Sequence, residues 1–121
     1  MQITLIDPHQ MTVAAETDYP AEARRLQGNP KRQTFNHYTN AREDVFAGVW
    51  TTEAGSWKVV CDPGEEELFT IIEGHARMVD EDGKVTDIHA GQSAVVPCGF
   101  KGVFEAVTPV KKFYMIINRA V

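Results

Sequence analysis

Two stretches decide the fold of this chain: Glu67-Leu68-Phe69-Thr70-Ile71-Ile72-Glu73-Gly74 and Gly91-Gln92-Ser93-Ala94-Val95-Val96-Pro97-Cys98-Gly99. Each contains a short apolar run rich in β-branched residues, and each ends at a glycine or a Pro-x-Gly turn. This is the pattern of a β-strand followed by a tight bend. Glu81-Asp82-Gly83, which lies between them, is a good hairpin loop. No long segment carries apolar residues at helical spacing, so the sequence predicts an all-β protein.

Short apolar runs separated by turn residues continue on both sides of these stretches. Their spacing of roughly 8–12 residues is typical of a β-sandwich or barrel. Strands are predicted over residues 45–51, 57–61, 68–72, 76–79, 85–88, 93–96, 103–107 and 111–117. The first forty residues lack this regular pattern of apolar runs and turns. A short strand is expected over residues 1–5 and one helical turn over residues 22–26. We therefore expect an N-terminal arm, residues 1–40, that packs on the barrel or on a partner subunit, followed by a barrel over residues 41–121.

Composition excludes several classes of function. The chain has 121 residues, a formal net charge of −5 and 43% hydrophobic residues, which suits one globular core. Basic residues form no stripe interleaved with aromatics, so no nucleic-acid partner is expected, and the apolar runs are too short to span a membrane. The stretch from Met1 to Pro8 lacks the features of a secretory signal, and Cys61 and Cys98 form no CxxC pair. These features predict a cytoplasmic protein with reduced thiols.

The two stretches quoted above resemble the second half of the first cupin motif and the start of the second cupin motif. Further stretches are similar to the cupin family named after (S)-ureidoglycine aminohydrolase, many of whose members have no assigned function. These stretches are Ala47 to Trp50, Gly55 to Trp57, Pro97 to Phe100 and Pro109 to Tyr114. The resemblance extends from about Gly28 onward. It implies a double-stranded β-helix, which is the RmlC-like jelly-roll barrel.

Metal-binding cupins hold a divalent ion with two histidines before the motif glutamate and one histidine after the Pro-x-Gly turn. The corresponding positions here are Val60 and Asp62, or Cys61 and Pro63 with a shorter loop, and Gly102. Only the carboxylate, Glu67, is retained. We therefore expect no cofactor. A residual divalent-metal site formed by Glu67 and Asp62, with Cys61, is the less favoured alternative.

Glu67 is the candidate catalytic residue. Strand alternation places it on the same face as Phe69 and Ile71, where an inward carboxyl is suited to act as an acid or base. The alternative is that the run from Glu65 to Glu67 is a solvated acidic turn. Aromatic and polar residues of the predicted barrel are the candidate ligand-binding set: Trp50, Trp57, Phe69, Phe104, Lys112 and Tyr114.

Three hypotheses for function follow from these residues. The first is a cupin that binds a small polar or anionic metabolite inside the barrel without a metal. The second is an enzyme that acts on a ureide or related small amide, with Glu67 as acid, base or metal ligand. The third, suggested by the N-terminal arm, is a structural or regulatory subunit. A homodimer is expected, in which each arm adds a strand to the partner's sheets and so protects exposed sheet edges.

Overall fold

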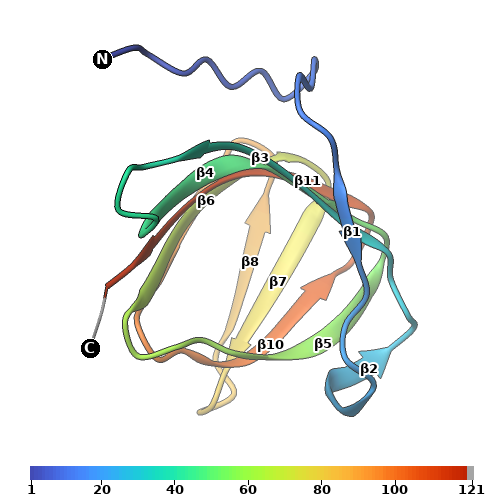
Figure 1. The fold of residues 1–121 in the computed structure, drawn as a ribbon. Coiled ribbons are helices and arrows are strands. Elements are labelled where there is room, and N and C mark those ends of the chain that lie inside the picture. The colour runs from blue at the N-terminus through green and yellow to red at the C-terminus, as the bar shows by residue number, and fades with distance from the viewer. Residues whose placement is uncertain (120–121) are drawn as a thin grey trace.

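Two antiparallel sheets face each other and close into a jelly-roll barrel in the computed structural model, which describes residues 1–119 (Figure 1). In order across the six-stranded sheet A, the strands are β1 (Glu16–Asp18), β3 (Arg32–Thr39), β4 (Val45–Thr52), β11 (Val110–Asn118), β6 (Glu65–Glu73) and β9 (Ser93–Val96). In the five-stranded sheet B they are β2 (Arg25–Gln27), β5 (Gly55–Val60), β10 (Lys101–Ala106), β7 (His75–Asp80) and β8 (Val85–His89). A three-residue 3-10 helix, η1, spans Glu22–Arg24. No helix in the described part of the chain has the length and apolar character needed to cross a membrane.

The predicted all-β jelly roll is confirmed, and all eight barrel strands lie within a few residues of their predicted bounds. The strand predicted over residues 1–5 is wrong. Residues 1–15 contain no strand, because no neighbouring strand of the chain pairs with their backbone. Three strands that were not predicted, β1, β2 and β3, lie instead within residues 16–39. They pair with strands of the same chain, β1 and β3 in sheet A and β2 in sheet B.

The side chains that point into the barrel fill one end of its interior and leave the other end hollow. At the filled end, near the Gly74 and Gly91 turns, small and medium apolar side chains are buried against one another: Ile71, Ala76, Ile88, Ala106 and Val110. At the hollow end the inward positions carry larger aromatic and charged side chains. Full burial of each large apolar side chain stabilises the fold by roughly 1.5–3 kcal/mol. The filled end therefore holds the two sheets together while the other end stays open.

Candidate functional site

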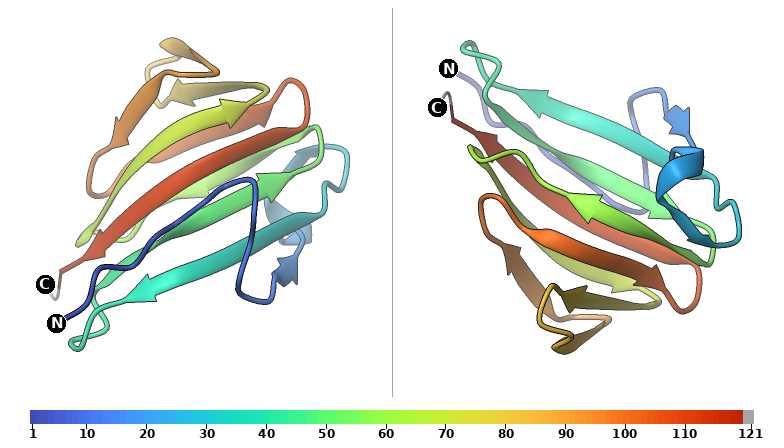
Figure 2. Two further views of the ribbon diagram at one scale, coloured as in Figure 1. Left: turned by 90° about the horizontal axis from the view of Figure 1, so that it is seen from above. Right: turned by 90° about the horizontal axis from the view of Figure 1, so that it is seen from below.

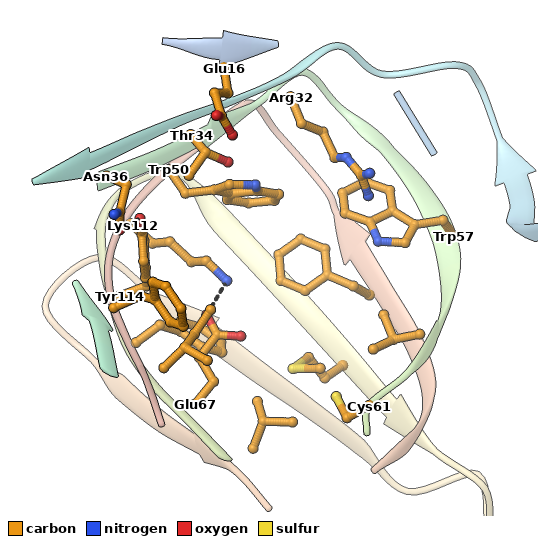
Figure 3. A pocket seen from close by; sticks show the side chains of 17 residues that line it. Glu16, Arg32, Thr34, Asn36, Trp50, Trp57, Cys61, Glu67, Lys112 and Tyr114 are labelled. Atoms are coloured by element: carbon orange, nitrogen blue, oxygen red, sulfur yellow. Dashed lines mark hydrogen bonds and ion pairs between the residues drawn. The ribbon is translucent and has the colours of Figure 1, made fainter. Parts of the chain in front are cut away.

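The open end of the barrel contains a cavity of about 560 Å³ (Figure 3). It brings together all the residues predicted to bind a ligand and the predicted catalytic residue: Trp50, Trp57, Phe69, Phe104, Lys112, Tyr114 and Glu67. These side chains come from β4, β5, β6, β10 and β11, so both sheets contribute. Their convergence follows from strand alternation, since each occupies an inward position of its strand.

Lys112 and Glu67 form an ion pair on the cavity wall. Lys112 Nζ donates to Glu67 Oε2 at 2.8 Å, and the two side chains are only 9% and 18% exposed. In the β6–β11 register Lys112 lies opposite Ile71, whereas Glu67 lies opposite Ile116. The lysine stem therefore runs along the inner face of sheet A to reach the carboxylate. Glu67 points inward, as predicted, and its role as acid or base stays a prediction.

Aromatic rings surround the Lys112 ammonium. Nζ lies 4.4 Å from the ring centroid of Phe69, 4.5 Å from that of Trp50 and 5.5 Å from that of Phe104. Phe104 also stacks on Trp57 with the centroids 5.1 Å apart. Ring faces attract a cation electrostatically and replace part of its lost hydration. The ammonium is thus stabilised by one carboxylate and three rings rather than by bulk water.

A second cation, Arg32 of β3, lies at the cavity wall above Trp57. Its guanidinium carbon is 5.0 Å from the Trp57 ring centroid. The guanidinium also donates from Nε and Nη2 to the two oxygens of Asp18, at 2.9 and 2.8 Å. This bidentate ion pair holds the short edge strand β1 against β3 and gives the guanidinium a defined orientation.

Tyr114 connects the β11 wall to β3. Its hydroxyl donates to Asn36 Oδ1 at 2.7 Å. Burial raises the pKa of Tyr114 to about 12, with further contributions from the negative charges of Glu67 and Glu16. Gly48 makes room for the hydroxyl, because a Cβ at that position would lie 2.9 Å from it. Tyr114 is therefore a neutral hydrogen-bond donor at physiological pH.

Comparisons with known proteins identify the family of the chain. The family model of the EutQ-like cupin domain matches residues 40–114. The chain belongs to this family. The cupin resemblance seen in the sequence is thereby confirmed. No curated protein matches this EutQ-like cupin in sequence.

Solved structures similar to this EutQ-like cupin show the same fold. A protein of unknown function of the DUF861 family from Pseudomonas syringae pv. tomato has a TM-score of 0.78 at 19% identity. The alignment covers 92% of this chain but 46% of that protein, so the chain spans about half its length. The EutQ protein of Clostridium difficile has a TM-score of 0.64 at 17% identity, covering 81% of this chain and 79% of its own. A protein described as ethanolamine utilization protein Q from Salmonella typhimurium has a TM-score of 0.63 at 12% identity, covering 90% and 99%.

The donor atoms in the cavity do not fit a divalent-metal centre. Of the positions that correspond to cupin histidines, Cys61 lines the cavity, whereas Val60 and Asp62 are exposed. Gly102 supplies no side chain, and Glu67 already binds the Lys112 ammonium. Within residues 1–119 no group of three His, Cys, Asp or Glu side chains is placed to hold an ion. The absence of a cofactor stays a prediction.

Cys61 is poorly suited to nucleophilic chemistry. Burial, together with the nearby carboxylates of Glu65 and Glu67, raises the pKa of its thiol to about 11. A thiol with so high a pKa is almost entirely protonated near neutral pH, and the thiolate is the reactive form. Cys98 is exposed and does not line the cavity.

The prediction missed the part of the cavity wall that lies upstream of the barrel motifs. Four polar residues of β1 and β3 line the cavity: Glu16, Arg32, Thr34 and Asn36. Three of them recur with period two in the sequence of β3, which is the signal of an inward strand face. Because this alternation is polar rather than apolar, it does not by itself distinguish a strand from a loop.

Proposed function

We propose that this EutQ-like cupin binds a small polar or anionic metabolite inside its barrel. The observation that carries the proposal is the Lys112–Glu67 ion pair on the wall of an aromatic cavity. The volume of about 560 Å³ lies within the range of roughly 300–1,000 Å³ that is typical of small-molecule sites. Such sites combine mostly apolar walls with a few polar groups that fix the orientation of the ligand.

Lys112 is the proposed anchor for the polar end of the ligand. An ammonium group has three hydrogens to donate, and the contact with Glu67 accounts for one of them. A ligand carboxylate or carbonyl would accept another, and Nη1 of Arg32, which the pair with Asp18 does not use, offers a second donor across the cavity. The apolar part of the ligand would then lie against Trp50 and Phe104.

Tryptophan fluorescence gives a direct test, because both tryptophans of the chain, Trp50 and Trp57, line the cavity. A panel of small carboxylates, ureides and neutral polar metabolites is screened for saturable changes in emission and for a raised Tm. A hit is expected to lose at least about tenfold in affinity in Lys112→Met, since a hydrogen bond to a charged group contributes about 1.5–3 kcal/mol.

Lys101→Met is the matched control for that experiment. Lys101 is an exposed lysine of β10 that does not line the cavity, so this variant should bind with unchanged affinity. A ligand that binds wild type and Lys112→Met equally well contradicts the proposal.

A second candidate is an enzyme that hydrolyses a ureide or related small amide, with Glu67 as the acid or base. It is favoured by one observation: among residues 1–119 the second oxygen of this cavity carboxylate, Oε1, has no hydrogen-bond partner. In that case Glu67→Gln should abolish ammonia release from the substrate while tryptophan emission shows the fold intact. Undiminished release by Glu67→Gln excludes the assignment.

A further inference from the structure

A second cavity, of about 500 Å³, adjoins the barrel cavity described above. We call it the side cavity. The residues that line both spaces form their common boundary: Arg32, Trp57, Val59, Cys61 and Glu67. Figure 3 shows Arg32 and Trp57 on the opposite side of the barrel cavity from Lys112. A ligand that is held at Lys112 and is long enough to pass Trp57 would therefore reach the side cavity.

The side cavity follows an edge of β5 that has no partner strand. Strand β10 pairs with β5 along its whole length, from Gly55 to Val60. Strand β2 pairs with the other edge of β5 only at Ser56 and Trp57. Residues 58–61 line the side cavity beyond that point. Because an unpaired strand edge presents free backbone N–H and C=O groups, this wall offers backbone donors to a ligand as well as side chains.

The segment between β1 and β2 forms the outer wall of the side cavity. It runs beside the barrel (Figure 2), and its lining residues are Tyr19, Pro20, Ala21 and Arg24. Pro20 is fully buried, and its carbonyl oxygen accepts a hydrogen bond from Arg25 Nε at 2.9 Å. The backbone N–H of Arg24 donates to the Ala21 carbonyl oxygen at 2.8 Å. These contacts hold the segment in place, so Arg24 belongs to a defined wall.

The side cavity has an excess of positive charge. Arg24 and Lys58 are exposed at its rim, and neither forms an ion pair with another residue among residues 1–119. Of the two acids that line this cavity, Glu67 is bound by Lys112, which leaves Glu65 as the one unpaired acid within the described residues. The chain as a whole has a net charge of −5. A cavity with two unpaired cations and one unpaired acid therefore attracts anions against the overall charge of the molecule.

We infer that the ligand of this EutQ-like cupin is an elongated molecule with an anionic group at each end. This inference rests on the proposed function, which assigns the first group to Lys112 in the barrel cavity. The second group, a carboxylate or a phosphate, is bound by Arg24 and Lys58 in the side cavity. It accepts charge-assisted hydrogen bonds there, which are stronger than those between neutral groups. The middle of the ligand passes Trp57 at the boundary between the two cavities.

The test compares α,ω-dicarboxylates, from succinate to suberate, with their half-amides by isothermal titration calorimetry. A half-amide has the length of its diacid and keeps one carboxylate, but the other end is a neutral polar group. At the length that spans both cavities, the diacid should bind about tenfold more tightly than its half-amide, since only the diacid places an anion beside the two cations. Phosphonocarboxylates of the same lengths then distinguish the two kinds of outer group. A larger gain than that of the diacid identifies a phosphate, and an equal or smaller gain identifies a carboxylate.

The double variant Arg24→Gln/Lys58→Gln should remove this gain. The diacid and its half-amide should then bind equally well, and the affinity for the half-amide should change by less than about twofold. Both side chains are exposed, so the fold should persist, and far-UV circular dichroism checks this. The matched control, Lys84→Gln/Lys101→Gln, removes two exposed lysines that line neither cavity and should retain the tenfold gain.

The two levels of the argument fail in different ways. If no member of the series binds, or if every ligand binds Lys112→Met as tightly as wild type, the proposed function fails and this inference fails with it. Half-amides that bind through Lys112, combined with diacids that bind no more tightly at any length, overturn only the inference. A gain that survives in Arg24→Gln/Lys58→Gln, or that is lost equally in Lys84→Gln/Lys101→Gln, overturns it as well.

Discussion

Removal of the Lys112–Glu67 ion pair, one partner at a time, is the sharpest test of how the cavity is built. Loss of one partner of a buried pair costs about 3–5 kcal/mol, because the other charge is left without compensation. Glu67 retains some contact with water, at 18% exposure, so the lower end of that range applies to Lys112→Met. This variant also loses the attraction of the ammonium to three aromatic rings. We expect it to lower the free energy of unfolding by about 3 kcal/mol.

The opposite variant, Glu67→Gln, should be milder. The Lys112 ammonium keeps its three aromatic neighbours, and the glutamine carbonyl still accepts a hydrogen bond, so a loss of about 1–2 kcal/mol is expected. The double variant removes both charges and leaves no unpaired ion. Its loss should be smaller than the sum of the two single losses by about 1–2 kcal/mol, which is the coupling energy of residues in contact.

Urea unfolding followed by tryptophan emission and by circular dichroism measures all three variants. For a domain of this size about 1 kcal/mol corresponds to roughly 4 °C in Tm. Lys101→Met, on the exposed face of β10, should change stability by less than about 0.5 kcal/mol. Additive losses, or equal losses for Lys112→Met and Glu67→Gln, would refute the view that the pair and its rings act as one unit.

Three further predictions concern other walls of the cavity. Burial raises the pKa of Cys61 from 9.0 to about 11, so iodoacetamide at pH 8 should modify the exposed Cys98 much faster than Cys61. Peptide mass spectrometry measures both rates, and faster modification of Cys61 would contradict this prediction. The pKa of Tyr114 is raised from 10.0 to about 12, so its contribution to stability is complete below pH 10 and lost as the pH rises to 12. In Tyr114→Phe the free energy of unfolding should therefore fall less between pH 10 and 12 than in wild type. An equal fall in both proteins would contradict the raised pKa of Tyr114. Gly48→Ala places a Cβ 2.1 Å from the Phe35 carbonyl oxygen and should lower the free energy of unfolding in urea by at least about 2 kcal/mol. An unchanged free energy of unfolding would show that β3 shifts to accommodate the methyl group.

The barrel strands were predictable because local signals and the tertiary fold agree there. The runs between Gly55 and Ile117 are apolar or β-branched, and glycine or proline turns separate them, so composition alone marks where each begins and ends. Strand β3, Arg32–Thr39, has no apolar inner face, since its inward residues contact the cavity rather than the core. A strand whose inner face is polar looks like a loop by composition, and only its pairing with β4 identifies it.

The candidate site was predictable as a set of residues but not as an arrangement. Strand alternation and the cupin motif were enough to place Glu67 and Phe69 inside the barrel. The contact between Glu67 and Lys112 joins residues 45 positions apart and depends on the register between β6 and β11. Register is a property of the assembled sheet, so no local pattern contains it. Cys61, by contrast, continues the inward alternation of Trp57 and Val59, so it lines the cavity while neighbouring Asp62 does not.

The ion pair also determines how this cavity responds to metal ions. A divalent ion bound at Glu67 would stand close to the Lys112 ammonium, which lies 2.8 Å from the same carboxylate. Two unit charges 4 Å apart repel by about 4 kcal/mol at an effective dielectric constant of 20, and a dication doubles that cost. No cavity histidine offsets this repulsion in the described chain. Elemental mass spectrometry of protein purified without chelator should therefore find far less than one transition metal per chain. A stoichiometric metal that disappears in Glu67→Gln would show that Lys112 yields its place to the ion, and the polar anchor of the cavity would then be the metal rather than the lysine.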